Sequence, residues 1–299
     1  MWLKVNSRVA IMKKIVFILI PIILFSACIN LNSNQDKEKN NSIVHPSKYS
    51  VVEADIPLTY YGNIDGVELG YQIAPHNVAM KSLEAFYKFH DTGNQSYRDR
   101  GLYLADWLLD NAKYRGNGNF VVWEYSYPWP PYDLKPEWTG SLNQATIIKA
   151  LTFAHLYSGD KKYTEMIGKA LNAFDVEVKD GGLKVLREDE GKIYVWYPEY
   201  AKEDPPYVLN GFITVIIRLR EYYLITTDKK AERLYQEGLL SLEHYLPNYD
   251  AGNKRSYYDT LGNIANDHYH EMHVAQLNSL YEYTKNPIFK EYKEKWERN

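Results

Sequence analysis

The sequence predicts an all-α protein, an α/α toroid of repeated helical hairpins with minor β structure at its N-terminal edge. Three observations predict this fold class. A short polar turn after an aromatic-rich helix end recurs along the chain. Apolar residues next to these turns follow the period of a helix. Long, tyrosine-rich connecting loops separate one helical pair from the next.

The recurring turn is the clearest internal repeat in the chain. Its copies are Thr92-Gly93-Asn94, Ser158-Gly159-Asp160, Thr226-Thr227-Asp228 and Thr284-Lys285-Asn286. Their central residues stand 66, 68 and 58 positions apart. Each turn ends in Asn or Asp, whose side chains cap the start of a following helix. The repeat therefore predicts four helical hairpins.

The apolar pattern of two segments supports these hairpins. After the second turn, apolar residues recur in steps of three and one, the period of one buried helical face. They are Tyr163, Met166, Ile167, Ala170, Leu171 and Phe174. The segment 208–223 is instead apolar nearly all round. A helix of that kind is expected to lie between neighbouring helices.

The connections between hairpins are expected to carry the function. A repeat of this length exceeds the roughly 34–47 residues of a two-helix solenoid unit. The excess lies at about residues 114–138, 175–207 and 247–270, and long structureless loops in a compact domain are usually functional. These connections hold 12 of the chain's 28 tyrosines. A closed ring of hairpins would bring them together in a cleft at one end.

The N-terminus is predicted to be a targeting segment. Lys13-Lys14 precedes an apolar run over residues 15–25, and small residues follow before Cys28, the single cysteine. This order resembles a bacterial lipoprotein signal. A run this short does not span a bilayer, which needs about 20 apolar residues. Lipid attachment is therefore expected at Cys28.

This interpretation divides the chain into three parts. Residues 1–27 are the signal peptide, residues 28–48 a flexible polar tether and residues 49–299 the toroid domain. The mature protein is expected at the cell surface, on the outer face of the cytoplasmic membrane. Its only membrane contact would be the lipid anchor.

Composition and missing motifs narrow the chemistry. With Lys+Arg 35 against Asp+Glu 38, the chain lacks the basic excess of a nucleic-acid binder. Neither a dinucleotide nor a phosphate-loop glycine pattern occurs, and no Gly-x-Ser-x-Gly nucleophile motif is present. His270 and His273 are three residues apart, whereas the metalloprotease helix needs four. We therefore expect neither metal nor cofactor, and Tyr, His, Glu and Arg remain for binding a sugar and exchanging protons.

Motifs in the second half of the chain resemble the C-terminal domain of the D-glucuronyl C5-epimerases, which act on heparan-type glycosaminoglycans. The motifs are Trp196-Tyr197-Pro198-Glu199-Tyr200, Tyr207-Val208-Leu209-Asn210-Gly211-Phe212, Leu246-Pro247-Asn248-Tyr249-Asp250, Tyr258-Asp259, Tyr269-His270 with His273 and Gln276-Leu277, and Asn286-Pro287 with Phe289-Lys290 and Trp296. Upstream, Trp138 with Ser141 and Gln144 fits as well. The resemblance covers about residues 70–298 and is strongest from residue 190 onward.

The resemblance implies an α/α toroid and a cofactor-independent isomerase. The reaction would invert C5 of uronic acid residues in an acidic polysaccharide or oligosaccharide, of the D-glucuronate to L-iduronate type, and a homodimer stays open. The implied catalytic residues are Glu199, Tyr200, Tyr258 and Tyr269. The implied substrate contacts are Trp138, Asn210 and His270, and Arg255 is a further candidate substrate contact that the family pattern does not supply.

Tyrosine catalysis sets an electrostatic requirement. A free phenol has a pKa of about 10, so a tyrosine base needs a nearby cation or hydrogen-bond donors to lower it. The candidates adjacent in sequence are Lys254, Arg255, His268 and His270.

Two departures from the family pattern leave other functions open. Thr260-Leu261-Gly262 stands where the family continues Leu-Arg-His, so the family arginine is absent and Arg255 is the candidate substitute. Residues 49–70 replace larger β-rich domains, so the toroid alone is expected to form the groove, with a shorter oligosaccharide or a completing partner. The alternatives are a uronate polysaccharide lyase, which shares the C5 proton abstraction, and a non-catalytic carbohydrate-binding surface protein.

Overall fold

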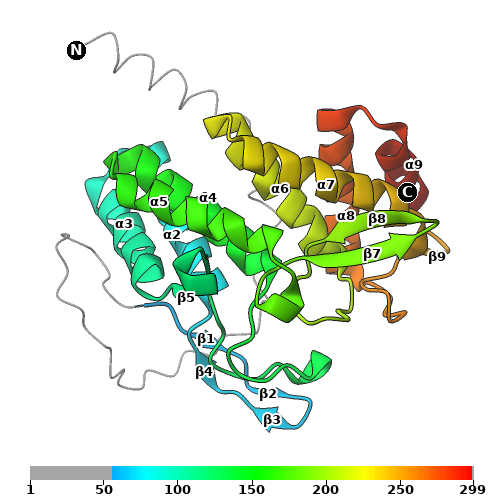
Figure 1. The fold of residues 1–299 in the computed structure, drawn as a ribbon, viewed down its shortest axis with the longest axis horizontal. Helices are drawn as coiled ribbons and strands as arrows, with labels where there is room; N and C mark the ends of the chain where they lie inside the picture. Colours follow the sequence, from blue (N-terminus) through cyan, green and yellow to red (C-terminus); the bar gives the residue numbers. More distant parts are fainter. Residues whose placement is uncertain (1–55, 298–299) are drawn as a thin grey trace.

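The computed structural model describes residues 56–297 and contains four helical hairpins within them (Figure 1). They are α2 (Pro75–Thr92) with α3 (Gln95–Asp110), α4 (Ser141–Ser158) with α5 (Lys161–Asn172), α6 (Leu209–Thr226) with α7 (Lys229–Tyr245), and α8 (Asp267–Thr284) with α9 (Pro287–Trp296). The first helices, α2, α4, α6 and α8, pack in succession as an inner layer, and each second helix packs on its own partner. The predicted α/α toroid of hairpins is confirmed.

All four turns lie where the repeat predicts them. The side chains of Asn94, Asp160, Asp228 and Asn286 accept backbone hydrogen bonds at the starts of α3, α5, α7 and α9. The residue before each cap adopts a left-handed conformation. At Gly93 and Gly159 it is a glycine, with φ of 69° and 74°, and the other two turns place Thr227 and Lys285 there. A cap and a left-handed residue together end one helix and start the next.

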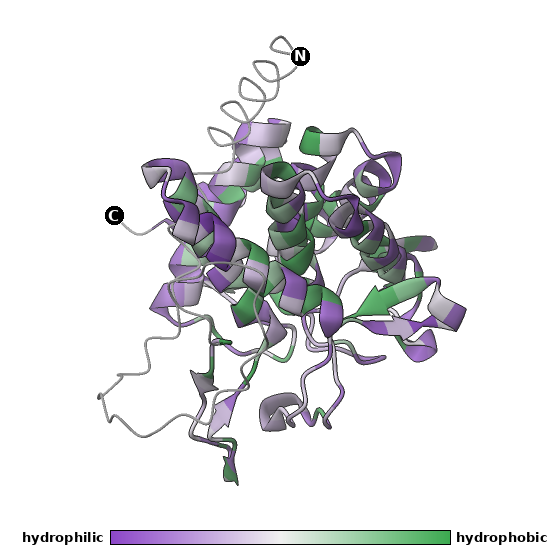
Figure 2. Ribbon diagram, turned by 90° about the vertical axis from the view of Figure 1, so that its left-hand side faces the viewer, coloured by the Kyte–Doolittle hydropathy of each residue, from purple (hydrophilic) through white to green (hydrophobic). Residues whose placement is uncertain are grey.

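Burial separates the two layers. Helices α4 and α6 are buried over most of their length, whereas α5 buries the single face that its periodicity indicates. In Figure 2 the hydrophobic colouring concentrates in the helices at the centre of the molecule. No helix among residues 56–297 is both long enough and apolar enough to cross a membrane. The proposed signal, tether and lipid site at Cys28 lie outside the described residues.

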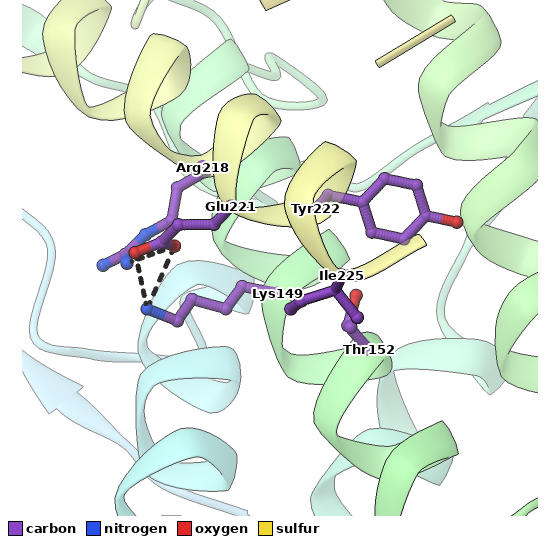
Figure 3. Close-up of a pocket in the computed structure, with 6 residues that line it drawn as sticks. All are labelled: Lys149, Thr152, Arg218, Glu221, Tyr222 and Ile225. Atoms are coloured by element: carbon purple, nitrogen blue, oxygen red, sulfur yellow. Dashed lines mark hydrogen bonds and ion pairs between the residues drawn. The ribbon is translucent and has the colours of Figure 1, made fainter. Parts of the chain in front are cut away.

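A buried ion cluster joins α4 to α6. The Glu221 carboxylate lies 3.1 Å from Lys149 Nζ and 2.9 Å from Arg218 Nη1, and all three side chains are at most 6% exposed. They line a small cavity with Thr152, Tyr222 and Ile225 (Figure 3). Breaking such a buried cluster by removing one partner typically costs about 3–5 kcal/mol. The cluster therefore fixes the two central helices against each other, near the middle of α4 and past the middle of α6.

The sequence led us to expect structureless connections between the hairpins, but the structure shows short strands and short helices in them. They contain the antiparallel pairs β5 (Lys113–Arg115) with β6 (Phe120–Val122), β7 (Val185–Asp189) with β8 (Lys192–Trp196), and β9 (Asp250–Gly252) with β10 (Arg255–Ser256). Short 3-10 helices complete them, at Gly116–Gly118, Pro130–Tyr132, Ala173–Asp175, Val178–Asp180 and Leu246–Tyr249. The turn between β7 and β8 shows how one of these strand pairs forms. Glu190 and Gly191 both have positive φ, which a two-residue hairpin turn requires.

The N-terminal edge is β structure, as predicted. β1 (Thr59–Tyr60) pairs with β4 (Tyr71–Gln72), and β2 (Asn63–Ile64) pairs with β3 (Val67–Glu68), all antiparallel. Figure 1 shows these strands beside the loop that precedes α4. They are packed onto that loop, because Tyr61, next to β1, contacts Tyr127 and Trp129. The expectation that the toroid alone forms the groove stays a prediction.

Candidate active site

The candidate site lies at the N-terminal ends of the inner helices. Glu199 and Tyr200 precede α6, Tyr258 lies in the connection before α8, and Tyr269 lies in the first turn of α8. The rings of Tyr258 and Tyr269 have centroids 4.7 Å apart. Tyr200 lies close enough to Glu199 and Tyr258, and Tyr258 to Tyr269, for each of these groups to influence the pKa of its neighbour. The structure thus brings the four predicted catalytic residues into one chain of contacts.

Backbone hydrogen bonds position these residues. The Leu209 N–H at the start of α6 donates to the Tyr258 carbonyl at 3.0 Å. The Tyr269 N–H donates to the side chain of Asn266, the cap of α8, also at 3.0 Å. Two helix starts therefore hold the two tyrosines together.

Glu199 occupies a gap that only glycines leave open. A Cβ at Gly140, the residue before α4, would lie 1.7 Å from the Glu199 carbonyl oxygen. A Cβ at Gly211, in the first turn of α6, would lie 2.1 Å from Glu199 Oε2. The carboxyl group is therefore packed directly on the start of α6. The partial positive charge of a helix N-terminus favours an anion there.

The Glu199 carboxyl group titrates near neutral pH. Its Oε2 is buried and has no hydrogen-bond partner among the described residues. Burial raises the pKa of this carboxyl group to about 7, against the opposing effect of the Tyr200 hydrogen bond. Both the neutral and the ionised forms are consequently populated at physiological pH.

The three tyrosines are held as neutral phenols. Burial raises the pKa of Tyr200, Tyr258 and Tyr269, and the nearby Glu199 carboxylate raises each further. The sequence led us to expect that a nearby cation or hydrogen-bond donors would lower the pKa of a catalytic tyrosine, but the net shift at all three is upward. The structure instead pairs the phenols with one another and with a carboxyl group.

None of the predicted cations is among the groups that most affect the pKa of the three tyrosines. Arg255, in β10, donates to the Asp267 carboxylate at 2.7 Å and to the Ala265 carbonyl. Lys254 is exposed in the β9–β10 turn, with φ of 57°. The His268 ring lies 5.4 Å from the Tyr269 ring, edge-on. Substrate contact by Arg255 would require it to leave this ion pair.

His270 is a structural residue rather than part of the cleft. Its Nδ1 accepts from the Ser256 N–H at 3.2 Å, so its Nε2 carries the proton and donates to the Trp296 carbonyl at 3.1 Å. The ring is fully enclosed and ties β10, α8 and α9 together. The substrate contact expected of His270 is therefore not what the structure provides.

Trp138 and Asn210 lie at the border of the cluster. The Trp138 ring stacks on Tyr125 at 3.9 Å and reaches Tyr200 at 5.7 Å. Asn210 is buried at the start of α6, and its carbonyl accepts from the Gln276 amide at 3.0 Å. Trp138 thus forms one wall of the aromatic cluster, and Asn210 links α6 to α8.

Sequence reasoning missed two residues of the site. The Tyr132 ring lies 4.6 Å from that of Tyr200, and its hydroxyl donates to the Asp259 carboxylate at 3.0 Å. Asp259 is buried and also accepts from Leu261 N–H and the Asn263 amide, which shapes the turn after Tyr258. An Asp followed by a polar, glycine-containing segment signals such a turn. Nothing in sequence places Tyr132 beside it.

The family described as D-glucuronyl C5-epimerase C-terminus matches residues 117–298. Uncharacterized protein MJ1128 of Methanocaldococcus jannaschii is 38% identical over 305 residues, which cover 96% of this chain and 99% of that protein. D-glucuronyl C5-epimerase of Caenorhabditis elegans is 30% identical over 212 residues, which cover 64% of this chain and 33% of that enzyme. The match thus spans about a third of the length of the nematode enzyme.

Among solved structures, two glycoside hydrolase family 76 proteins of Bacteroides thetaiotaomicron are similar in part. The mannosidase Bt3792 aligns with a TM-score of 0.48 and 12% identity, over 70% of this chain and 55% of its own. The α-mannanase BT2949 aligns with the same score and identity, over 77% of this chain and 62% of its own.

Gly211→Ala tests the packing of Glu199. The added Cβ would lie 2.1 Å from Oε2 and 2.9 Å from Cβ of Glu199, so the carboxyl group or α6 must move. We expect the free energy of unfolding to fall by about 1–3 kcal/mol. Gly168→Ala in α5 is the matched control, because its Cβ would meet nothing within 4 Å. Urea unfolding measures both, and equal stabilisation of the two variants would contradict the described contact.

Glu199→Gln tests the raised pKa. The pKa of Glu199 in the folded protein, about 7, lies above its ordinary value of 4.5. Protonated Glu199 therefore makes its full contribution to stability below about pH 4.5, and this contribution is lost as the pH rises through about 7. Relative to wild type, the variant should therefore gain up to about 3 kcal/mol between about pH 4 and pH 9. Denaturant unfolding across this range measures the gain, with the exposed Glu282→Gln as control. A stability difference independent of pH would refute the raised pKa.

Proposed function

The chain belongs to the D-glucuronyl C5-epimerase C-terminus family, and from this premise we propose that it is a cofactor-independent uronate C5-epimerase. Family membership points to carbohydrate epimerisation in general. The finer proposal is inversion at C5 of uronic acid residues within an acidic polysaccharide or oligosaccharide. One observation carries it: Glu199, Tyr200, Tyr258 and Tyr269 gather near the N-terminal ends of the inner helices, with the Tyr258 and Tyr269 rings 4.7 Å apart and each group influencing the pKa of its neighbours.

The chemistry needs two proton carriers and a donor. The C5 proton of a uronic acid lies next to a carboxylate, and its removal places negative charge on that carboxyl group. Inversion requires a base on one face of the sugar and an acid on the other. Hydrogen-bond donors directed at the carboxyl group must stabilise the charge that develops.

Glu199 and Tyr200 together supply the base. A phenol with a raised pKa is almost never ionised at neutral pH, so Tyr200 alone would be a poor base. Ionised Glu199 can accept the Tyr200 phenolic proton while the phenolic oxygen takes the proton from C5. The carboxyl group then holds one more proton, Tyr200 is neutral again, and the substrate is a carbanion. The carboxyl pKa of about 7 suits this exchange.

Tyr258 or Tyr269 supplies the acid. Their raised pKa values keep them protonated, as a proton donor and as hydrogen-bond donors to the substrate carboxyl group. Proton transfer to the opposite face of C5 leaves a phenolate. Once the product has left, the proton on Glu199 can return to this phenolate through Tyr200, which lies beside Tyr258. The cycle then closes with no net change in the protein, and it runs in either direction.

The test is proton exchange in deuterated water. A uronate polysaccharide incubated with the protein should gain deuterium at C5 without new chain ends, at a rate rising with pH through about 7 as Glu199 ionises. Each of Tyr200→Phe, Tyr258→Phe and Glu199→Gln should slow exchange by about 100-fold to 10,000-fold. Tyr222→Phe, a buried tyrosine at the other end of α6, is the control and should exchange at the wild-type rate.

The products separate the alternatives. New unsaturated chain ends would show a lyase, because elimination starts with the same proton abstraction and then expels the 4-O substituent. Binding without exchange in the wild-type protein would refute epimerisation. Exchange at the wild-type rate in the variants would refute the roles given to these residues.

A further inference from the structure

A loop over residues 125–138 extends alongside the candidate active site. Two antiparallel bridges close it, Tyr125 with Trp138 and Trp129 with Leu134. Its tip is docked onto the site, because the Tyr132 hydroxyl donates to Asp259 at 3.0 Å. The loop is therefore an ordered part of the site.

Trp129 occupies a distinct position in this loop. Its ring is nearly parallel to that of Tyr200, at 9°, with centroids 6.5 Å apart. Its other neighbour is Tyr61, whose ring meets it edge-on at 5.8 Å. The Trp129 side chain remains partly exposed, and its indole N–H has no hydrogen-bond partner among the described residues. A partly exposed indole thus continues the catalytic cluster toward solvent.

Tyr61 is fixed in this arrangement from a separate segment. The Tyr127 hydroxyl donates to the Tyr61 hydroxyl at 3.0 Å, and the two rings lie 5.2 Å apart. Its neighbour in sequence, Tyr60, faces the other side of the ribbon and pairs with Tyr71 at 4.9 Å. Adjacent strand residues point to opposite faces of the ribbon, so only Tyr61 lies beside Trp129.

We propose that Trp129 and Tyr61 form a binding site for the sugar linked to the reacting uronate. The inference rests on the proposed function and deepens it by naming the residues that contact the neighbouring sugar of the glycan chain. The reacting sugar would lie against Tyr200, Tyr258 and Tyr269, and its neighbour against the Trp129 face.

The side chains of Trp129 and Tyr61 are suited to binding a pyranose ring. An indole offers a broad apolar face for the C–H surface of a sugar and one N–H for a hydroxyl. Neither Trp129 nor Tyr61 carries a charge. Trp129 and Tyr61 would therefore contact the C–H face of the neighbouring ring and leave the charged groups of that sugar exposed to water. Glu199 and the three phenols are left for the reacting unit.

Trp129→Ala is the test. We expect KM for C5 exchange in a uronate tetrasaccharide to rise by about ten-fold, with kcat within about three-fold of wild type. A uronate methyl glycoside, which lacks the neighbouring sugar, should be affected less than about two-fold. Trp129→Phe keeps an aromatic face and should recover most of the loss. Tyr60→Ala is the matched control and should change neither parameter.

The outcomes separate this site from the proposed function. An unchanged KM for the tetrasaccharide in Trp129→Ala, with wild-type exchange intact, would overturn the subsite alone. If wild-type protein exchanges no C5 proton, titration calorimetry with the same tetrasaccharide decides. If Trp129→Ala weakens binding about ten-fold, the sugar-binding site stands although the protein is not an epimerase. Equal binding by the wild type and the variant would overturn the subsite.

Discussion

The close packing of the Glu199 carboxyl group against the start of α6 is the constraint on which the rest of the site depends. It excludes a side chain at Gly211, because a Cβ there would overlap the carboxyl group, and the backbone carbonyl of Glu199 likewise excludes one at Gly140. It also removes Oε2 from water, which raises the carboxyl pKa to about 7. Tyr200, the next residue, is then directed at the carboxyl group and at Tyr258. One packing contact thus sets both the geometry and the protonation state of the proposed base.

The toroid explains how such a contact can be maintained. Glu199 is held between two inner helices, and those helices are joined farther along by the buried Lys149, Arg218 and Glu221 cluster. A relative shift of α4 and α6 would break this cluster and also press Gly211 into the carboxyl group. The structural ion cluster therefore lies on the same helix pair as the reactive carboxyl group, farther from the helix starts.

The sequence was sufficient for the helices because each hairpin turn carries its own local signal. A cap such as Asp160 acts on the N–H groups of its own helix, so tertiary context is not needed to read it. The grouping of Glu199, Tyr200, Tyr258 and Tyr269 followed from family resemblance. Spacing alone could not show that residues about 60 positions apart meet. The prediction of four helical hairpins is therefore confirmed within residues 56–297.

Other parts of the site depend on contacts that have no local signal. Tyr132 and Trp129 join it because a bridged loop folds back over Tyr200, and Tyr61 arrives from the N-terminal ribbon. Proximity in sequence also misled us about Arg255 and His270. Arg255 is paired with Asp267, and His270 is enclosed beside Trp296, so neither lowers a tyrosine pKa. Adjacent residues at a helix start point in different directions, and only the fold decides which face the cleft.

The most direct measurement of the central claim is the titration of the Glu199 carboxyl group itself. Carbon-13 NMR of protein labelled at the glutamate side-chain carboxyl carbon would follow it, with Glu199→Gln identifying its signal. The account predicts a midpoint near pH 7, as burial of this carboxyl group requires. A midpoint near the ordinary glutamate value of about 4.3 would contradict it, because Tyr200 would then lack a base that accepts a proton at neutral pH.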